Sequence, residues 1–187
     1  MTETSKETLE NLVEKARAGN RQAFSDIVRQ LMNQVVALTY RMTGERESAL
    51  DLAQDTFVAA WEKLESFRGD ASFASWVYRI ASNKALNYLK SNARQVTSGE
   101  IQEPVAPENI ANPAQQLYHR ELADNIRKFM ASLPTQQRLI FELRFYKEMT
   151  FKEIAETTDR ALGTVKTGYR EAIKKLRVFA QEEGWHR

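Results

Sequence analysis

The sequence predicts an all-α protein made of two small helical domains joined by a flexible linker. Only 7 of its 187 residues are Gly and 4 are Pro, so long stretches are free to be helical. Apolar residues recur at three- and four-residue steps through most of the chain, as on one face of an α-helix. No stretch shows the alternation and turn punctuation of β-strands.

The linker is predicted from Gly99 and three of the four prolines, which fall within residues 93–117. Proline removes an amide donor and disfavours the helical conformation in the residue before it. This stretch also lacks helical periodicity. We therefore place the two domains at 1–92 and 118–187 and expect the linker to let them move apart.

Each domain is predicted to contain four helices. In the first domain, Gly19-Asn20 and Thr43-Gly44 interrupt the apolar pattern, and Ser72 is placed to cap the last helix. The expected helices are 9–18, an apolar stripe from 24 to 38, 47–64 and 73–92. In the second domain, Pro134 begins one helix and Thr150 with Glu153 forms a capping box. The expected helices there are 116–132, 136–146, 151–157 and 163–180.

Composition limits the function. Hydrophobic residues make up 42% and charged residues 28%, as in globular proteins. The chain has no Cys and 2 His, which excludes disulfides and thiolate sites and disfavours a metal centre. We expect no cofactor, no metal and a cytoplasmic location, since the sequence contains no signal peptide and no membrane-spanning run.

Positive charge gathers in the second domain. Residues 1–92 are neutral overall, residues 93–117 carry −2 and residues 118–187 carry +4. Five of the cations lie between Gly163 and Arg177, against one anion. Such a local excess suits a surface that meets phosphates, although a charged run is more often a solvated helix face.

A helix-turn-helix is predicted over 150–177. A short capped helix is followed by a turn and a longer amphipathic helix, whose inner face includes Val165 and Ala172. This geometry places the start of a recognition helix in a DNA major groove. A plain helical hairpin with a basic exterior would fit the pattern as well. The candidate DNA contacts are Thr164, Lys166, Thr167, Arg170 and Lys174.

An aromatic segment, 67–84, is the second candidate site. Aromatic residues alternate with Arg, Asn and Lys, as in proteins that stack bases on rings and meet phosphates with cations. A base lifted from its stack also needs polar groups to recognise its edge. Phe73 and Val77 have the spacing of core residues, and Trp76 fits either role.

Together, the segments 51–57, 67–69 and 76–83 resemble region 2 of extracytoplasmic-function sigma factors. Ser132-Leu133-Pro134 and the hairpin 153–166 resemble region 4 of the same family. The resemblance covers nearly the whole chain and implies an alternative sigma factor, not an enzyme. Such a factor binds core RNA polymerase and directs promoter-specific initiation.

The resemblance implies roles for matched positions. The −10 promoter element would be bound by Ser66, Phe67, Arg68, Gly69, Asp70, Arg79, Asn83 and Lys84. The −35 element would be bound by Thr164, Lys166, Thr167, Arg170 and Lys174. The clamp coiled coil of the largest polymerase subunit would be bound by Asp51, Gln54 and Asp55, and the flap of the second-largest subunit by another face of region 4.

The resemblance also implies an anti-sigma factor, which could hold the protein at the membrane. The departures from the family pattern lie in region 4. The family usually has apolar residues near Thr158 and Arg160, and it often has Arg where this chain has Gly168 and Glu171. Glycine within a helix costs about 1 kcal/mol relative to alanine. Glu171 would repel a nearby phosphate.

Three other functions each fit part of the sequence. An autonomous helix-turn-helix regulator would explain region 4 but not the aromatic segment, and it would bind its operator without polymerase. A sigma-like decoy would lose the promoter pocket, whereas Phe67, Arg68, Gly69 and Asn83 are present. An enzyme is the weakest alternative, because we find no cysteine nucleophile, phosphate-binding glycine loop or metal-ligand cluster.

Overall fold

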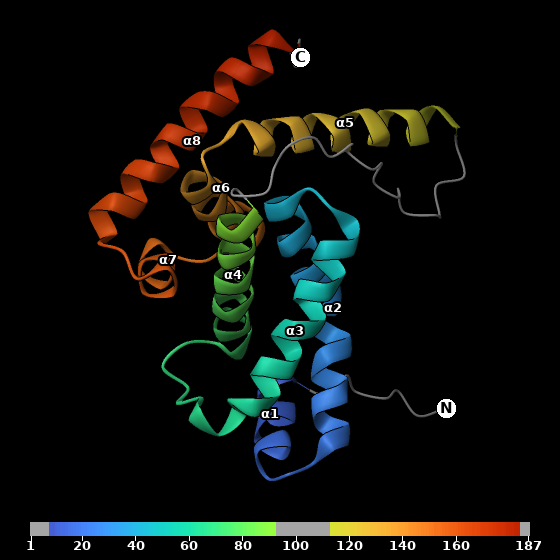
Figure 1. The fold of residues 1–187 in the computed structure, drawn as a ribbon, viewed down its shortest axis with the longest axis vertical. Helices are drawn as coiled ribbons and strands as arrows, with labels where there is room; N and C mark the ends of the chain where they lie inside the picture. Colours follow the sequence, from blue (N-terminus) through green and yellow to red (C-terminus); the bar gives the residue numbers. More distant parts are fainter. Residues whose placement is uncertain (1–7, 93–112, 184–187) are drawn as a thin grey trace.

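The computed structural model describes residues 8–92 and 113–183, with side chains from residue 121 onward in the second range. Within these residues the fold is helical and has no strands, which confirms the predicted all-α class (Figure 1). The elements are α1 (Leu9–Arg17), α2 (Arg21–Thr43), α3 (Arg46–Glu62), η1 (Leu64–Ser66), α4 (Phe73–Asn92), α5 (Pro113–Ser132), α6 (Thr135–Phe141), η2 (Glu142–Tyr146), α7 (Phe151–Thr158) and α8 (Leu162–Glu182).

Helix α2 is the centre of the first bundle and contacts α1, α3 and α4. Its apolar stripe faces inward, with Ile27, Val35 and Leu38 fully buried. Thr39 continues the stripe and donates a hydrogen bond of 2.8 Å to the carbonyl of Ala49 on α3. Gly44 ends α2 with a φ of 80°, a left-handed conformation that suits glycine.

The helix boundaries agree closely with the predictions in the first domain. Ser72 caps α4, because its hydroxyl accepts a hydrogen bond of 3.1 Å from the Ser75 amide. Helix α5 begins at Pro113, three residues before the predicted start, since proline fits the first turn of a helix. The rest of the predicted linker, 93–112, lies outside the described residues.

The continuous helix predicted over 136–146 is interrupted. Helix α6 ends at Phe141 and is followed by η2, a π-helical turn in which the Lys147 amide donates to the Glu142 carbonyl at 3.3 Å. A π-turn accommodates one more residue than an α-turn. Here Glu142 and Leu143 are neighbours in sequence and both are completely buried.

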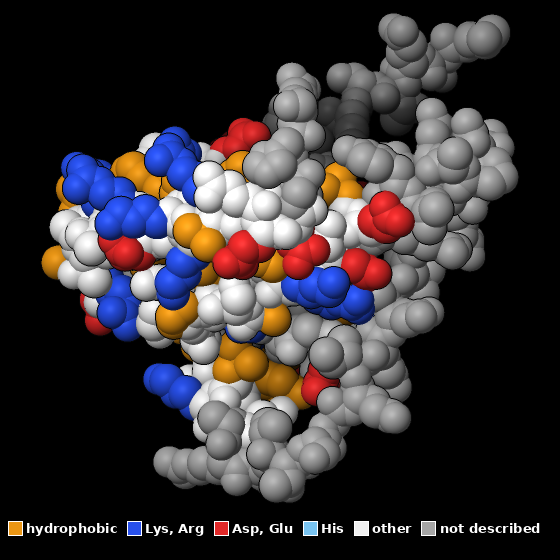
Figure 2. Space-filling model, turned by 90° about the horizontal axis from the view of Figure 1, so that it is seen from above, with side chains coloured by type: hydrophobic (Ala, Val, Ile, Leu, Met, Phe, Trp, Pro, Cys, Tyr) orange, Lys and Arg blue, Asp and Glu red, His pale blue; other side chains and the backbone are white. Residues whose placement is uncertain are grey.

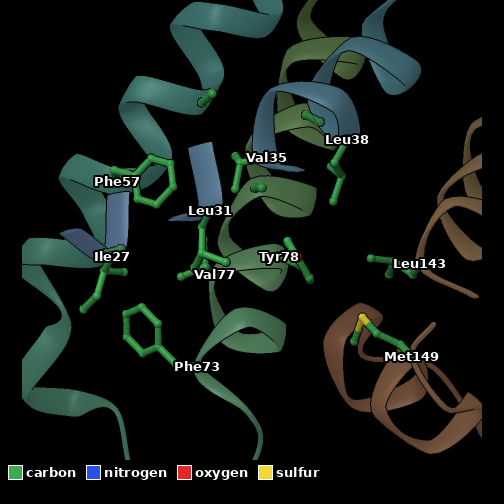
Figure 3. Close-up of a cluster of buried hydrophobic side chains, with 14 of the residues drawn as sticks. Ile27, Leu31, Val35, Leu38, Phe57, Phe73, Val77, Tyr78, Leu143 and Met149 are labelled. Carbon is green, nitrogen blue, oxygen red and sulfur yellow. The ribbon is translucent and has the colours of Figure 1, made fainter. Parts of the chain in front are cut away.

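The two domains pack against each other. One hydrophobic cluster includes the core of α1–α4 and also Leu139, Leu143 and Met149 of the second domain. Figure 3 shows Leu143 and Met149 facing Tyr78 on α4. Helix α7 lies beside α4, and α5 crosses the end of the first bundle (Figure 1). The linker was predicted to let the two domains move apart. In this structure the two domains share one hydrophobic cluster.

No helix in the described part of the chain is both long and apolar enough to span a membrane. Among the same residues, no group of three or more His, Asp or Glu side chains is placed to hold a metal ion.

Candidate nucleic-acid and polymerase interfaces

The loop between η1 and α4 forms one wall of a pocket of about 590 Å³. Gly69 has a φ of 81° and gives the loop its turn. From the first domain the pocket is lined by Ser66, Phe67, Arg68, Gly69, Asp70, Ala71, Ser75, Trp76 and Arg79. The structure therefore brings together six of the eight residues predicted to contact −10 DNA.

Three aromatic rings pack against one another beside this pocket. The ring of Phe67 lies 5.2 Å from that of Phe73, edge to face, and 5.4 Å from that of Trp76. Phe73 is buried, as its spacing predicted, whereas Phe67 and Trp76 are partly exposed and line the pocket. Such aromatic pairs favour edge-to-face and tilted arrangements. Phe67 is thus held in place by packing and still offers a surface to the pocket.

Asn83 and Lys84 are not among the residues that line this pocket. Asn83 is exposed on α4, one turn beyond Arg79. The Lys84 ammonium lies 3.5 Å from the carboxylate of Asp55 on α3. Lys84 therefore connects the candidate −10 surface to the candidate polymerase surface.

The outer face of α3 carries the predicted polymerase contacts. Asp51, Gln54 and Asp55 are all exposed. Apolar residues that the sequence did not single out accompany them: Leu50, Val58 and Trp61 are 37%, 58% and 38% exposed. The apolar periodicity of this helix places Trp61 on the inner stripe, but its ring lies over that of Phe24 at the edge of the bundle. Leu50 and Val58 are two four-residue steps apart, and this spacing could have predicted that they lie on the same helix face as Gln54.

Helices α7 and α8 form the predicted helix-turn-helix. The capping box is present, since the Glu153 amide donates to the Thr150 hydroxyl and the Thr150 amide donates to the Glu153 carboxylate. Asp159 ends α7 with a φ of 51° and so turns the chain toward α8. The inner face of α8 buries Val165 and Ala172, as predicted.

The predicted −35 contacts lie on the outer face of α8. All five, Thr164, Lys166, Thr167, Arg170 and Lys174, are exposed. In Figure 2, many of the visible Lys and Arg side chains lie on the side of the molecule that α8 occupies in Figure 1. The five residues share one accessible helix face, as a recognition helix requires.

A groove of about 540 Å³ lies between α6 and α8 beside these residues. It adds Gln136, Gln137 and Arg160 to the candidate DNA surface, none of which the sequence singled out. Glu171 also lines it and accepts a hydrogen bond of 2.8 Å from Lys174, which lowers the pKa of the Glu171 carboxyl. The expected repulsion by Glu171 is therefore partly offset by its neighbour.

The contact between the domains contains a buried ion pair. The guanidinium of Arg41 on α2 donates two hydrogen bonds to the carboxylate of Glu142, at 2.6 and 2.8 Å, and the Glu142 side chain is fully buried. Burial raises the pKa of Glu142, and the hydrogen bonds from Arg41 oppose this shift. Burial also lowers the pKa of Lys147 to about 8.

Comparison with known proteins agrees with this geometry. The family model for Sigma-70 region 2 matches residues 27–95, and that for Sigma-70 region 4 matches residues 129–178. The chain is 33% identical over 174 residues to the ECF RNA polymerase sigma-E factor of Salmonella typhimurium, with 87% of this chain and 90% of that protein covered.

Two further proteins show the same similarity. The RNA polymerase sigma-H factor of Pseudomonas aeruginosa is 28% identical over 177 residues, which cover 89% of this chain and 92% of that protein. The solved structure of CnrH in complex with the cytosolic domain of CnrY is 26% identical, with a TM-score of 0.67. The match covers 91% of this chain and 96% of CnrH.

Two helical domains with a loop pocket and a helix-turn-helix, matched in order by regions 2 and 4, define the class of sigma-70 factors. The chain belongs to the extracytoplasmic-function group of this family. It is an alternative sigma factor that directs promoter-specific transcription.

Proposed function

We propose that the pocket between η1 and α4 captures an unpaired base of the −10 element. The support is chemical: a partly exposed Phe67 ring is available for stacking, and Arg68 and Arg79 line the same pocket. Ser66 and Asp70 supply polar groups that can recognise a base edge. Asn83 and Lys84 extend this surface along α4.

The outer face of α8 binds the −35 element in the same proposal. Lys166 and Arg170 are one turn apart and both exposed, so they can reach adjacent phosphates or base edges in a major groove. Thr164 and Thr167 can donate to either. Lys174 lies a further turn along the helix and suits a phosphate contact.

The outer face of α3 binds the clamp coiled coil of the largest polymerase subunit. Exposed apolar area at Leu50, Val58 and Trp61 supplies burial, and the acidic and amide groups at Asp51, Gln54 and Asp55 suit a basic partner. Another face of region 4 binds the flap of the second-largest subunit.

The observation that carries the proposal is the pocket that gathers aromatic, cationic and polar groups from the η1–α4 loop and the start of α4. Chemistry would belong to the polymerase, and this chain would contribute binding energy and strand capture, with no cofactor or metal of its own. We place the protein in the cytoplasm. CnrH was solved in complex with the cytosolic domain of CnrY, which favours a protein partner for this chain too, and we propose that this partner is an anti-sigma factor.

The test is in vitro transcription with purified bacterial core polymerase, this protein and a genomic fragment library. Transcripts that start at discrete sites sharing spaced −35 and −10 sequences are expected, and the experiment identifies the promoter. Binding to core without any transcript would favour the decoy. Binding to DNA alone without binding to core would favour the autonomous regulator.

A further inference from the structure

The −10 pocket has a second wall that comes from region 4. Lys152, Glu153, Glu156 and Thr157 of α7 line it opposite the loop that contains Phe67. Glu153 is fixed there by its capping box, in which its carboxylate accepts from Thr150. A DNA strand that enters this pocket would meet α7, whose two carboxylates repel phosphates and outnumber its single cation, Lys152.

The arrangement is held by the Arg41–Glu142 pair. Its two hydrogen bonds are bidentate, the geometry that is strongest for a guanidinium and a carboxylate. The Arg41 guanidinium also lies 3.9 Å from the centre of the Tyr146 ring. Because Glu142 has no exposed surface, removing Arg41 would leave an unpaired charge in the interface.

Two further hydrogen bonds cross the same interface. Arg138 donates to the carbonyl of Met42, in the last turn of α2, at 2.7 Å. Lys147 donates to the carbonyl of Gln34 at 2.7 Å, and the Gln34 side chain is itself held within the first domain by the Tyr78 hydroxyl. These contacts and the shared apolar cluster fix one relative placement of the two domains.

This placement cannot bind both promoter elements at once. Elements centred near −35 and −10 are about 25 base pairs apart, or roughly 85 Å of duplex at 3.4 Å per base pair. A compact domain of about 100 residues has a radius of gyration of about 13 Å, so two touching domains do not extend so far. The domains must separate before the promoter is bound.

We propose that the free protein is autoinhibited by its own region 4: α7 forms one wall of the −10 pocket and obstructs a DNA strand there, and the Arg41–Glu142 pair holds this closed state until polymerase separates the domains. The inference rests on the −10 role proposed for the pocket. If the proposal holds, DNA binding by the free protein is limited by separation of the two domains and not by the folding of either domain.

The test uses the full chain, whose lack of Cys allows selective labelling. Cysteines introduced at exposed Gln22 on α2 and Gln181 on α8 carry spin labels that report the interdomain distance. We expect a single narrow distance distribution in the parent protein and a broad distribution after Arg41→Ala, with the ratio of open to closed raised about tenfold or more. Added core polymerase should replace the narrow distribution of the parent protein.

Two variants separate loss of the pair from loss of folding. Arg29→Ala removes another α2 arginine, which pairs with Asp26 on the surface of the same domain, and should leave the distance unchanged. Arg41→Met with Glu142→Met removes both charges and keeps apolar volume, so it should stay closed. A distribution in Arg41→Ala as narrow as in the parent protein, or a broad distribution in the parent protein, would overturn the proposal.

A second measurement tests inhibition itself. Arg41→Ala should bind a single-stranded −10 oligonucleotide, taken from the promoter that the transcription experiment identifies, about tenfold more tightly than Arg29→Ala does, in line with the expected shift toward the open state. Opening without a gain in affinity would show that α7 does not block the pocket and would refute autoinhibition. The distance measurement needs no DNA, so failure of the closed state and failure of the −10 role can be told apart.

Discussion

Gly168 on α8 lies so close to Ile140 on α6 that a Cβ atom at position 168 would approach the Ile140 Cδ1 to 2.8 Å. Ile140 is buried in the shared apolar cluster. Helices α6 and α8 therefore pack closely at Gly168, which has no side chain to hold them apart. This contact gives a packing reason for one of the departures from the family pattern, which the sequence alone presents only as a cost in helix propensity.

The effect of Gly168→Ala on the free energy of unfolding should therefore depend on the residue at position 140. Alanine gains about 1 kcal/mol of helix propensity, but its methyl group requires the end of the Ile140 side chain to move. Ile140→Val removes Cδ1 at a cost of about 0.5–1.5 kcal/mol. We expect Gly168→Ala to be more favourable when it is combined with Ile140→Val, measured by urea unfolding as a double-mutant cycle. Additive effects would contradict the contact.

Phe67→Ala should impair promoter opening and leave binding to core polymerase nearly intact. A base that stacks on an aromatic ring contributes about 1–3 kcal/mol. The ring also packs on Phe73 and Trp76, so Phe67→Leu is the matched variant that keeps apolar contact but removes the ring face. Both should lower permanganate reactivity at −10. An equal loss of core binding would exclude the role.

Arg170→Ala should weaken −35 recognition and reduce the slope of log affinity against log salt by about one if the contact is to a phosphate. Arg177→Ala is the control, because Arg177 is exposed on the same helix two turns later and is not a predicted contact. Footprinting of the upstream element by holoenzyme measures the effect. An unchanged footprint with Arg170→Ala would argue against this residue.

The closed state should become more favoured as the pH rises from about 8 toward 10, the window between the two pKa values of Lys147. Burial lowers the pKa of Lys147 to about 8 in the closed state, where it faces Arg41, Glu142 and Tyr78. Once exposed in the open state, it should titrate near its ordinary pKa of 10.5. The open state then binds more protons within this window, so raising the pH favours closure. The Tyr78 pKa, raised to about 12, keeps that group neutral throughout.

The interdomain distance measured across this pH range checks the prediction. Lys147→Met cannot titrate and should lose the pH dependence. A fraction of closed molecules that falls as the pH rises would show that another group controls the equilibrium.

Local sequence signals located the individual elements well. Ser72 and the Thr150–Glu153 box begin their helices as predicted, and Gly44 ends one. The outer face of α8 was also predicted correctly, because periodicity alone separates Val165 and Ala172 from Lys166 and Arg170. These features depend on residues within a few positions of each other.

Features that depend on distant residues were not predicted. Arg41 and Glu142 are 101 positions apart, and nothing near either residue identifies its partner. The pocket wall from α7 likewise required the relative placement of the domains. The exposure of Trp61 could not be predicted, because an apolar step of three or four residues does not distinguish the edge of a bundle from its centre.

The π-turn η2 gives the chain a way to change its regulation without changing its DNA contacts. Adding or removing one residue rotates the helical residues that follow by about 100°, which is the rotation per residue of an α-helix. A descendant that lost this residue would direct Tyr146 and Lys147 away from Arg41, while α7 and α8 could keep their capping box and recognition face intact. If the proposed closed state exists, a single-codon deletion in η2 would therefore weaken it and leave the recognition helix in place.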